Sequence, residues 1–213
     1  MPVKKVARKS VASREGKLFV VSAPSGAGKS TLCQRLIKST PGLKLSVSYT
    51  TRERRKGERN NVHYTFVNES MFKRMIKKGD FAEWAVVHGN LYGTSLSRLR
   101  ELNKKGYDII LDIDIHGAMQ IKKSYENAEY IFILPPSMSV LKKRLLGRNT
   151  DSGETIAKRL KNAREEIRHY KDYDYVIKND ILDKAYREFE SIILSSRIKQ
   201  NNIDKKWINK LIS

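Results

Sequence analysis

The sequence SAPSGAGKS occupies residues 22–30, directly after the short apolar run at residues 18–21. This places the motif between an expected strand and an expected helix. Glycines at such a turn let the backbone curl with its N–H groups inward, while the helix directs its positive N-terminal end to the same point. These features are typical of a loop that binds the phosphates of a nucleotide. The alternative is a glycine-rich turn that only caps an ordinary helix.

The residues of this motif have separate expected roles. Gly26 and Gly28 permit the curled backbone, and Lys29 is expected to neutralise the β and γ phosphates of ATP. Ser30 would place its hydroxyl on Mg²⁺, which bridges the same oxygens. Ala23 stands at the motif's usual first glycine, which is tolerable where φ is negative. The predicted ATP-binding residues of this stretch are Ser25, Gly26, Ala27, Gly28, Lys29, Ser30 and Thr31.

Length and composition favour a single globular domain. The chain has 213 residues, of which 39% are hydrophobic, enough for one core. Its apolar runs are too short to span a bilayer, and the N-terminal stretch lacks the apolar middle region of a secretory signal. Cys33 is the only cysteine, which excludes an intrachain disulfide and a cysteine-based zinc cluster. We therefore expect a cytoplasmic protein without a membrane segment, in which Cys33 is a packed thiol.

The net charge of +20 concentrates toward the two ends of the chain. Residues 1–16 form a basic N-terminal tail, and residues 201–213 form a C-terminal extension. Such ends are usually solvated, but a nucleic-acid role through phosphate contacts is an open alternative. In the C-terminal extension, Trp207, Ile208 and Leu211 predict either a docked terminal helix or a subunit contact, which leaves a homo-oligomer open.

Short β-rich runs alternate with helical segments, which predicts an α/β fold with a parallel sheet flanked by helices. The expected strands are residues 18–22, 45–49, 107–113, 130–134 and 175–177. Helices are expected after Lys29, over about residues 95–105, and from near residues 117, 139, 154 and 181. Between residues 49 and 106 the rhythm changes to turns, an alternating run and a short helix, which predicts an inserted mixed α+β lobe.

The inserted lobe carries groups suited to an acceptor phosphate. Several arginines lie within residues 48–58, and guanidinium groups grip a dianionic phosphate with paired hydrogen bonds. Tyr64 and Tyr92 can each donate a phenolic hydrogen bond, and Gly93 leaves room for close backbone approach. The alternatives are a solvated basic loop for the arginines and ordinary packing for the tyrosines.

Taken together, these motifs resemble those of guanylate kinases, specifically the bacterial enzymes. The resemblance covers residues 18 to about 199. The matching stretches are residues 22–31, 48–58, 81–84, 92–94, 112–114, 135–137, 145–148 and 179–180. It implies a P-loop core at about residues 17–47, 106–138 and 172–200, with a GMP-binding lobe at about 48–105 and a mobile helical lid at about 139–171. The domain as a whole would span residues 17–200.

The resemblance implies transfer of the γ-phosphoryl group of ATP to GMP, and to dGMP, in purine nucleotide metabolism, with Mg²⁺ as cofactor. By position, its GMP-binding residues are Ser48, Arg52, Arg55, Tyr64, Glu83, Tyr92, Gly93, Thr94 and Asp114. A physical reading of Glu83 agrees, because guanine shows two adjacent donors, N1–H and N2–H₂, that one carboxylate can accept. Adenine shows an acceptor there and would leave the carboxylate unpaired. Without the resemblance, Glu83 would be read as a surface residue on an edge strand.

Asp112 and Asp114 end an apolar strand, where active-site carboxylates gather in open α/β sheets, and alternation predicts that both point to the same side. The resemblance assigns Asp112 to the metal, together with Ser30, and Asp114 to the GMP side. It also assigns ATP-phosphate roles to Arg144 and Arg148. Asn179 would contact the adenine side. The implied catalytic residues are Lys29, Arg52, Arg148 and Arg159, and for the lid arginines the alternative is salt bridging on a helix surface.

Two departures and two rival functions accompany this interpretation. His116 stands where many relatives have glutamine, and Asn149 replaces the glycine that usually follows the lid arginine. Kinase-like domains of this family also occur as noncatalytic modules that bind phosphorylated partners, but such a module has no need of Lys29 and Asp112. A kinase for another monophosphate is the other rival. No catalytic histidine is expected, because an acceptor phosphate is already anionic at neutral pH.

Overall fold

The computed structural model describes residues 16–87, 89–125, 127–147, 152–199, 203 and 205–213. Its central sheet has five strands in the order β2-β7-β1-β8-β9, and every neighbouring pair is parallel. The strands are β1 (Leu18–Ser22), β2 (Leu43–Leu45), β7 (Asp108–Asp112), β8 (Glu129–Leu134) and β9 (Tyr175–Lys178). Because parallel strands end at one edge, Val21, just before the phosphate loop, pairs with Asp112 at the end of β7.

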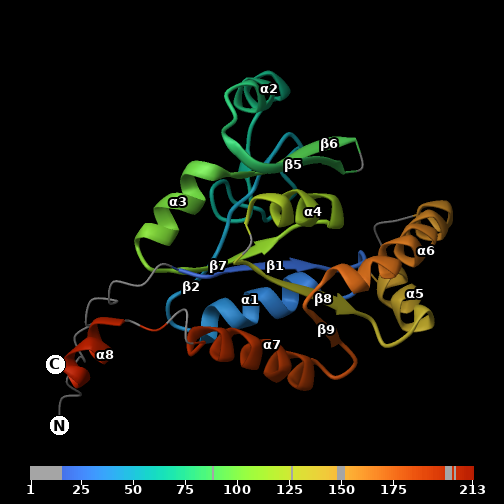
Figure 1. Cartoon of the computed structure of the whole chain (residues 1–213). Coiled ribbons are helices and arrows are strands. Elements are labelled where there is room, and N and C mark those ends of the chain that lie inside the picture. Colours follow the sequence, from blue (N-terminus) through green and yellow to red (C-terminus); the bar gives the residue numbers. More distant parts are fainter. Residues whose placement is uncertain (1–15, 88, 126, 148–151, 200–202, 204) are drawn as a thin grey trace, which may run out of the picture.

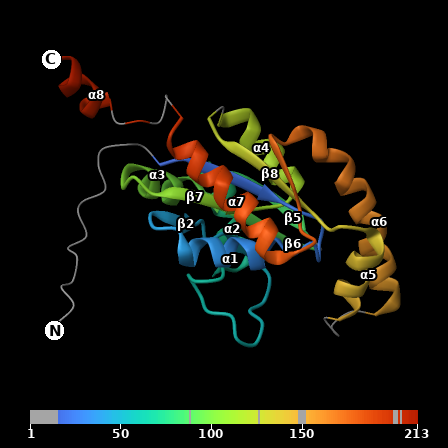
Figure 2. The same cartoon turned by 90° about the horizontal axis from the view of Figure 1, so that it is seen from below.

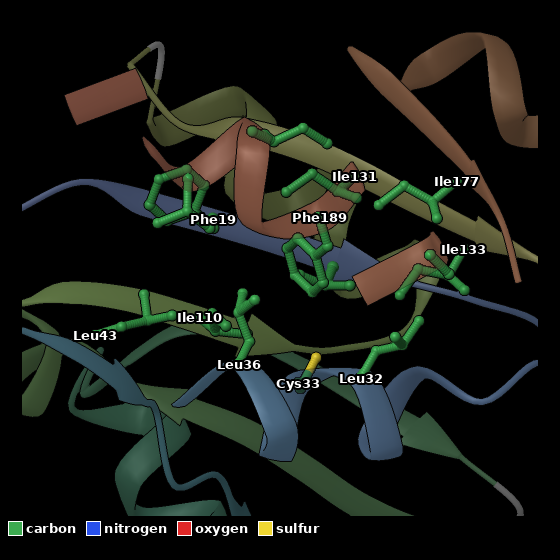
Figure 3. Packing of buried hydrophobic residues seen from close by; sticks show 14 residues of the cluster. Phe19, Leu32, Cys33, Leu36, Leu43, Ile110, Ile131, Ile133, Ile177 and Phe189 are labelled. Carbon is green, nitrogen blue, oxygen red and sulfur yellow. The ribbon is translucent and has the colours of Figure 1, made fainter. Parts of the chain in front are cut away.

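Helices cover both faces of this sheet, which confirms the α/β class (Figure 1). On one face, α1 (Lys29–Ser39) and α7 (Leu182–Arg197) pack on the sheet, and Figure 3 shows Leu36 and Phe189 beside Phe19 of β1. On the other face, α4 (Ile115–Ser124) and α3 (Leu96–Lys104) contact the alternate residues of β1, such as Val20. Cys33 is buried in the first of these clusters, as expected for a packed thiol.

A second, four-stranded sheet lies on the α4 side of the molecule (Figure 1). Its order is β4-β3-β6-β5, with β3 parallel to β4 and antiparallel to β6, and with β5 antiparallel to β6. The strands are β3 (Tyr49–Thr50), β4 (Thr65–Phe66), β5 (Phe81–Val87) and β6 (Asn90–Ser95), and α2 (Glu69–Lys77) lies between β4 and β5 in sequence. This mixed sheet confirms the inserted α+β lobe.

Two helices form a separate layer beside the carboxyl ends of β8 and β9. They are α5 (Met138–Leu146) and α6 (Gly153–Arg168), followed by the 3₁₀ turn η1 (His169–Asp172). Ser137 and Ser152 cap the two helices by accepting the N–H groups of Val140 and Thr155. Leu141 and Leu145 of α5 pack against Ile156 and Ala163 of α6 in a small core of their own. Figure 2 shows this pair of helices at one end of the molecule.

The expected strand at residues 45–49 is wrong. β2 ends at Leu45, where the N–H of Ser46 still donates to Ile110 O at 2.9 Å, and the next strand, β3, begins at Tyr49. The apolar alternation through Val47 is real, but its two ends belong to different sheets. The chain therefore leaves the central sheet at the point where the inserted lobe begins.

The C-terminal helix α8 (Lys205–Ile212) does not dock on the core. Every one of its residues is exposed, and Trp207 and Leu211 retain 59% and 69% of their accessible surface. Of the two alternatives for this segment, docking is therefore contradicted. No helix among the described residues is both long and apolar enough to cross a membrane.

Candidate active site

The phosphate loop joins β1 to α1 in the conformation that its glycines predict. Gly26 and Gly28 have φ values of 94° and 98°, in the left-handed region that favours glycine. Gly28 is the N-cap of α1, so the helix begins at Lys29. Asn61 is the only described non-glycine residue with a positive φ, so Ala23 meets the condition under which a methyl group is tolerated at its position.

Two side chains from distant segments hold this loop from outside. The carbonyl oxygen of Ala27 accepts from Asn179 Nδ2 at 2.7 Å and from Arg144 Nη1 at 3.2 Å. Arg144 Nη2 also donates to Asn179 O at 2.9 Å, which links the two supports. A Cβ at Gly28 would lie 2.3 Å from Asn179 Nδ2, so the approach requires glycine there. The structure thus brings Arg144 and Asn179 to the loop through its backbone.

Lys29, Ser30 and Asp112 meet at the carboxyl edge of the sheet. Lys29 Nζ lies 2.5 Å from Asp112 Oδ1 and donates to Ile113 O at 2.9 Å, while Ser30 Oγ donates to Asp112 Oδ2 at 3.2 Å. Burial lowers the pKa of Lys29, but the charge and hydrogen bond of Asp112 outweigh it and hold the pKa above its ordinary value. Lys29 is therefore a fixed cation beside the loop.

Ser30 and Asp112 fit a magnesium site. Mg²⁺ takes oxygen ligands and is usually held by one or two protein groups, with phosphates and water completing the shell. Ser30 and Asp112 supply such oxygens within hydrogen-bond distance of each other. Among the described residues no group of three or more His, Cys, Asp and Glu side chains could hold a metal ion alone. The donor set therefore suits a cation that arrives with a nucleotide.

The predicted acceptor-phosphate residues form a cluster in the second sheet. Arg52 Nη2 lies 2.7 Å from Glu58 Oε1, and the guanidinium carbon is 5.5 Å from the ring centroid of Tyr64. Tyr64 and Tyr92 meet edge to face, with ring centroids 5.8 Å apart. Burial raises the pKa of Tyr64, and the charge of Asp112 raises it further, so the Tyr64 phenol remains a proton donor. Arg55, by contrast, is exposed.

Glu58 is a residue of this cluster that the sequence does not identify as functional. Its second oxygen accepts the backbone N–H of Arg55 at 2.8 Å, so one carboxylate fixes both the side chain of Arg52 and the turn that follows it. Burial raises the pKa of Glu58, but these bonds outweigh that effect and lower it overall. Acidic residues in a basic loop are common, and only the folded contact distinguishes this one.

Glu83 lies deep in the same lobe. Its side chain is on β5, the residue is 4% exposed, and Oε1 accepts from Thr94 Oγ1 of β6 at 2.5 Å. Burial raises the pKa of Glu83 to about 7, with a smaller raising effect from Asp114, while the Thr94 hydrogen bond lowers it. Among the described residues no salt bridge pairs Glu83, and burial of an unpaired carboxylate is costly, so the group is suited to a ligand that brings hydrogen-bond donors. Glu83 does lie on an edge strand, but its burial contradicts the alternative of a surface glutamate.

The other predicted GMP residues lie nearby with different local roles. Ser48 is half-buried and its carbonyl accepts the N–H of Thr65 at 2.9 Å, which ties the start of the lobe to β4. Gly93 faces inward: a Cβ there would lie 2.9 Å from Phe81 and 3.0 Å from Phe72. The side on which a larger residue would carry its Cβ is closed by these rings, and the approach of a ligand to the backbone of Gly93 stays a prediction.

Asp112 and Asp114 do not lie on one strand, so the expectation that strand alternation points both to the same side is wrong. β7 ends at Asp112, so strand alternation does not extend to Asp114. Asp114 is instead the N-cap of α4 and accepts the N–H of Gly117 at 2.8 Å. Its charge still acts on Glu83, which places it toward the second sheet. His116, in the first turn of α4, is exposed.

The lid residues are described only in part. Arg159 lies on α6 and is half-buried. Arg148 and Asn149 lie outside the described residues. Glu166, also on α6, has its pKa raised by burial and by the charge of Asp114, so this helix reaches toward the phosphate end of the site. This contribution of α6 is not evident from its sequence, because it depends on how the helix folds back.

A parallel sheet with this loop after its first strand, and with Lys29, Ser30 and Asp112 at one edge, defines the class of P-loop nucleotide-binding proteins. Residues 15–196 match the profile of the family described as guanylate kinase. The guanylate kinases of Syntrophotalea carbinolica and Geobacter metallireducens are 51% and 50% identical, over 89% and 87% of this chain and 90% and 92% of theirs. The chain belongs to the guanylate kinase family.

A solved structure gives the same result for the fold. The crystal structure of guanylate kinase from Anaplasma phagocytophilum is 34% identical and superimposes with a TM-score of 0.74. The match covers 88% of this chain and 89% of the other.

Proposed function

We propose that the chain transfers the γ-phosphoryl group of ATP to GMP, and to dGMP, giving ADP and GDP or dGDP. The observation that carries this proposal is the pair of sites on one molecule. Lys29, Ser30 and Asp112 meet at the phosphate loop, and Glu83 lies buried in the adjoining lobe, close enough for Lys29 to influence its pKa. Membership of the guanylate kinase family supports it.

On the donor side, the backbone N–H groups of the loop and the Lys29 ammonium would hold the ATP phosphates. Ser30 and Asp112 would hold Mg²⁺, which offsets the negative charge that develops on the transferred group. Arg144 and Asn179 both donate to the carbonyl oxygen of Ala27, which fixes the backbone of the loop. Arg144 and Asn179 would therefore act mainly by shaping the loop.

On the acceptor side, Arg52, Arg55, Tyr64 and Tyr92 would bind the GMP phosphate. Arg52 is already oriented by Glu58 and by the ring of Tyr64, which reduces the entropy lost when it grips the phosphate. At the other end, Glu83 would accept the N1–H and N2–H₂ groups of guanine, with Thr94 and Ser48 beside it. Asp114 would lie on the GMP side of the site.

The transfer itself needs no strong base. The acceptor phosphate is anionic near neutral pH, and phosphoryl transfer depends on in-line positioning and on stabilisation of charge. Lys29 and Arg52 would act from the donor and acceptor sides. Arg148 and Arg159 would close from the lid segment at about residues 139–171. In this proposal the core comprises about residues 17–47, 106–138 and 172–200, and the GMP-binding lobe comprises about residues 48–105.

The rival functions have less support. A noncatalytic binding module would have no reason to hold Lys29, Ser30 and Asp112 together, and the similar proteins are named as kinases. The nucleic-acid hypothesis stays a prediction, because most of the basic N-terminal tail lies outside the described residues.

A coupled assay across monophosphates tests the proposal. With ATP and Mg²⁺, we expect GMP and dGMP to be phosphorylated. AMP, UMP and TMP should react at least about 10³-fold more slowly in kcat/KM. Adenine shows Glu83 an acceptor at N1, and the smaller pyrimidine rings offer one N–H donor in place of the two adjacent donors of guanine. The noncatalytic module would give no turnover with any acceptor. Comparable turnover of AMP and GMP would contradict the role of Glu83.

The elevated pKa of Glu83 predicts a pH dependence. The pKa is about 7 in the unliganded protein, so the carboxylate that guanine needs is lost as the pH falls through that value. Below pH 7 we expect the KM for GMP to rise by about tenfold per pH unit, and above pH 8 to be flat. The GMP phosphate also titrates near pH 6, so Glu83→Gln is the matched control that retains only the phosphate's contribution. The same profile in both proteins would contradict the assignment.

A further inference from the structure

A side chain of α4 holds β5, the strand that carries Glu83. β5 is an edge strand of the second sheet, so one row of its backbone groups has no partner strand. Its free edge lies beside α4, as Figure 1 shows. Gln120 of α4 accepts the N–H of Trp84 at 3.2 Å and donates to the carbonyl oxygen of Trp84 at 2.8 Å. A single amide therefore replaces the missing strand at the residue next to Glu83.

The same face of α4 also receives the carboxylate of Glu83. Gly117 lies one turn before Gln120, and a Cβ at Gly117 would stand 2.6 Å from Glu83 Oε2. The bare helix surface at Gly117 lets the carboxylate lie against α4, and Gln120 fixes how far β5 extends along it. Gln120 thus fixes the backbone of Trp84, and Gly117 leaves space for the side chain of Glu83 against the same helix.

Within its own sheet, β5 has an irregularity directly before Glu83: its pairing with β6 shifts register between Phe81 and Glu83 and is regular from Glu83 to Val87. The carboxylate itself has one hydrogen-bond partner on β6, Thr94. Such an irregularity changes the direction of a side chain, so the direction of Glu83 depends on how β5 is held here, and a displacement of about 1 Å is enough to weaken a directed contact severely. The two hydrogen bonds at Trp84 fix the free edge of β5 at the next residue.

We infer that Gln120 is a positioning residue for guanine recognition: it holds β5 so that the Glu83 carboxylate faces the purine. The inference rests on the proposed function. α4 begins at Asp114, directly after the strand that ends at Asp112, so the helix fixes the guanine end of the site relative to the metal end. Gln120 touches neither nucleotide in this account and acts only through β5.

The kinetic test uses Gln120→Met, which keeps the length of the side chain and removes both hydrogen bonds. We expect the KM for GMP to rise about tenfold, while kcat and the KM for ATP change less than about twofold. Lys123→Met, at an exposed position one turn further along α4, is the matched control and should leave all three constants unchanged. If the methionine variant does not fold, Gln120→Glu takes its place. This change keeps the acceptor and loses the donor, and it should raise the KM for GMP by about threefold.

A double-mutant cycle separates positioning from general loosening of the lobe. In the Glu83→Gln background, Gln120→Met should change the KM for GMP less than about twofold, because the group that it positions is already gone. An equal KM effect in both backgrounds, or equal losses for ATP and GMP, would overturn the inference alone. A wild-type chain that leaves GMP unconverted would overturn it together with the proposed function.

Discussion

We expect the replacement of Lys29 with methionine to lower kcat by about 10³-fold or more with every acceptor nucleotide. The ammonium group is held beside the phosphate loop by Asp112 and by the carbonyl of Ile113, so its charge is already in place before ATP binds. A preorganised charge stabilises the transferred phosphoryl group without any reorganisation during the reaction. Methionine has similar length and leaves the β and γ phosphates without this cation. The measurement is kcat with GMP and with dGMP at saturating ATP.

The matched control for this prediction is Lys38→Met. Lys38 lies in the last turn of the same helix and is exposed, so the change removes equal charge from α1 without touching the loop. Its kcat should equal that of the unmodified chain. Circular dichroism establishes that both variants are folded. A folded Lys29→Met protein that retains more than about a tenth of the original kcat would contradict the assigned role.

Replacing Glu83 with glutamine has the second large expected effect. Glutamine fits the same buried space, but it offers one acceptor and places an amide donor toward guanine's own donors. We expect kcat/KM for GMP to fall by about 10²-fold to 10³-fold, because a buried polar group is left facing the wrong partner. The KM for ATP should stay unchanged, since the phosphate loop is not altered. Steady-state kinetics with each substrate varied in turn measures both effects.

Glu69→Gln is the control for this substitution. Glu69 is an exposed residue of α2 in the same lobe, paired only with Lys73 on the helix surface, so its loss should leave GMP kinetics unchanged. Unchanged use of GMP by the Glu83→Gln protein would remove the basis for guanine selectivity at this position. A parallel loss in the KM for ATP would indicate general damage to the fold.

Most of the fold could be predicted because short stretches of sequence, such as glycine turns and apolar runs, determine its elements. The glycines of residues 22–30 permit a left-handed backbone, and Gly26 and Gly28 adopt it. β1 is a short apolar run between turn signals, and three of the other expected strands, β7, β8 and β9, follow similar runs. The prediction failed at residues 45–49, where one alternating pattern is shared between two sheets. Pattern alone does not show where a chain crosses from one sheet to another.

The candidate site could be predicted from the sequence only in part. The residues of the phosphate loop lie next to each other in sequence, whereas the contacts that support them span long separations: Ala27 to Asn179, for example. Gln120 and Trp84 are 36 residues apart, and nothing in either neighbourhood indicates the other. Asp114 was grouped with Asp112 by strand alternation, but it is a helix cap. Such roles depend on tertiary geometry, so the sequence names the reacting groups more readily than the groups that position them.

The most direct test of the account is a crystal structure of the chain with GMP and a non-hydrolysable ATP analogue. We expect the N1–H and 2-amino groups of guanine within hydrogen-bond distance of the Glu83 carboxylate, and the terminal phosphate of the analogue on Lys29. The GMP phosphate should lie between Arg52, Tyr64 and Tyr92, pointing at the analogue. Guanine bound away from Glu83, or the two nucleotides bound without their phosphates facing each other, would contradict the account.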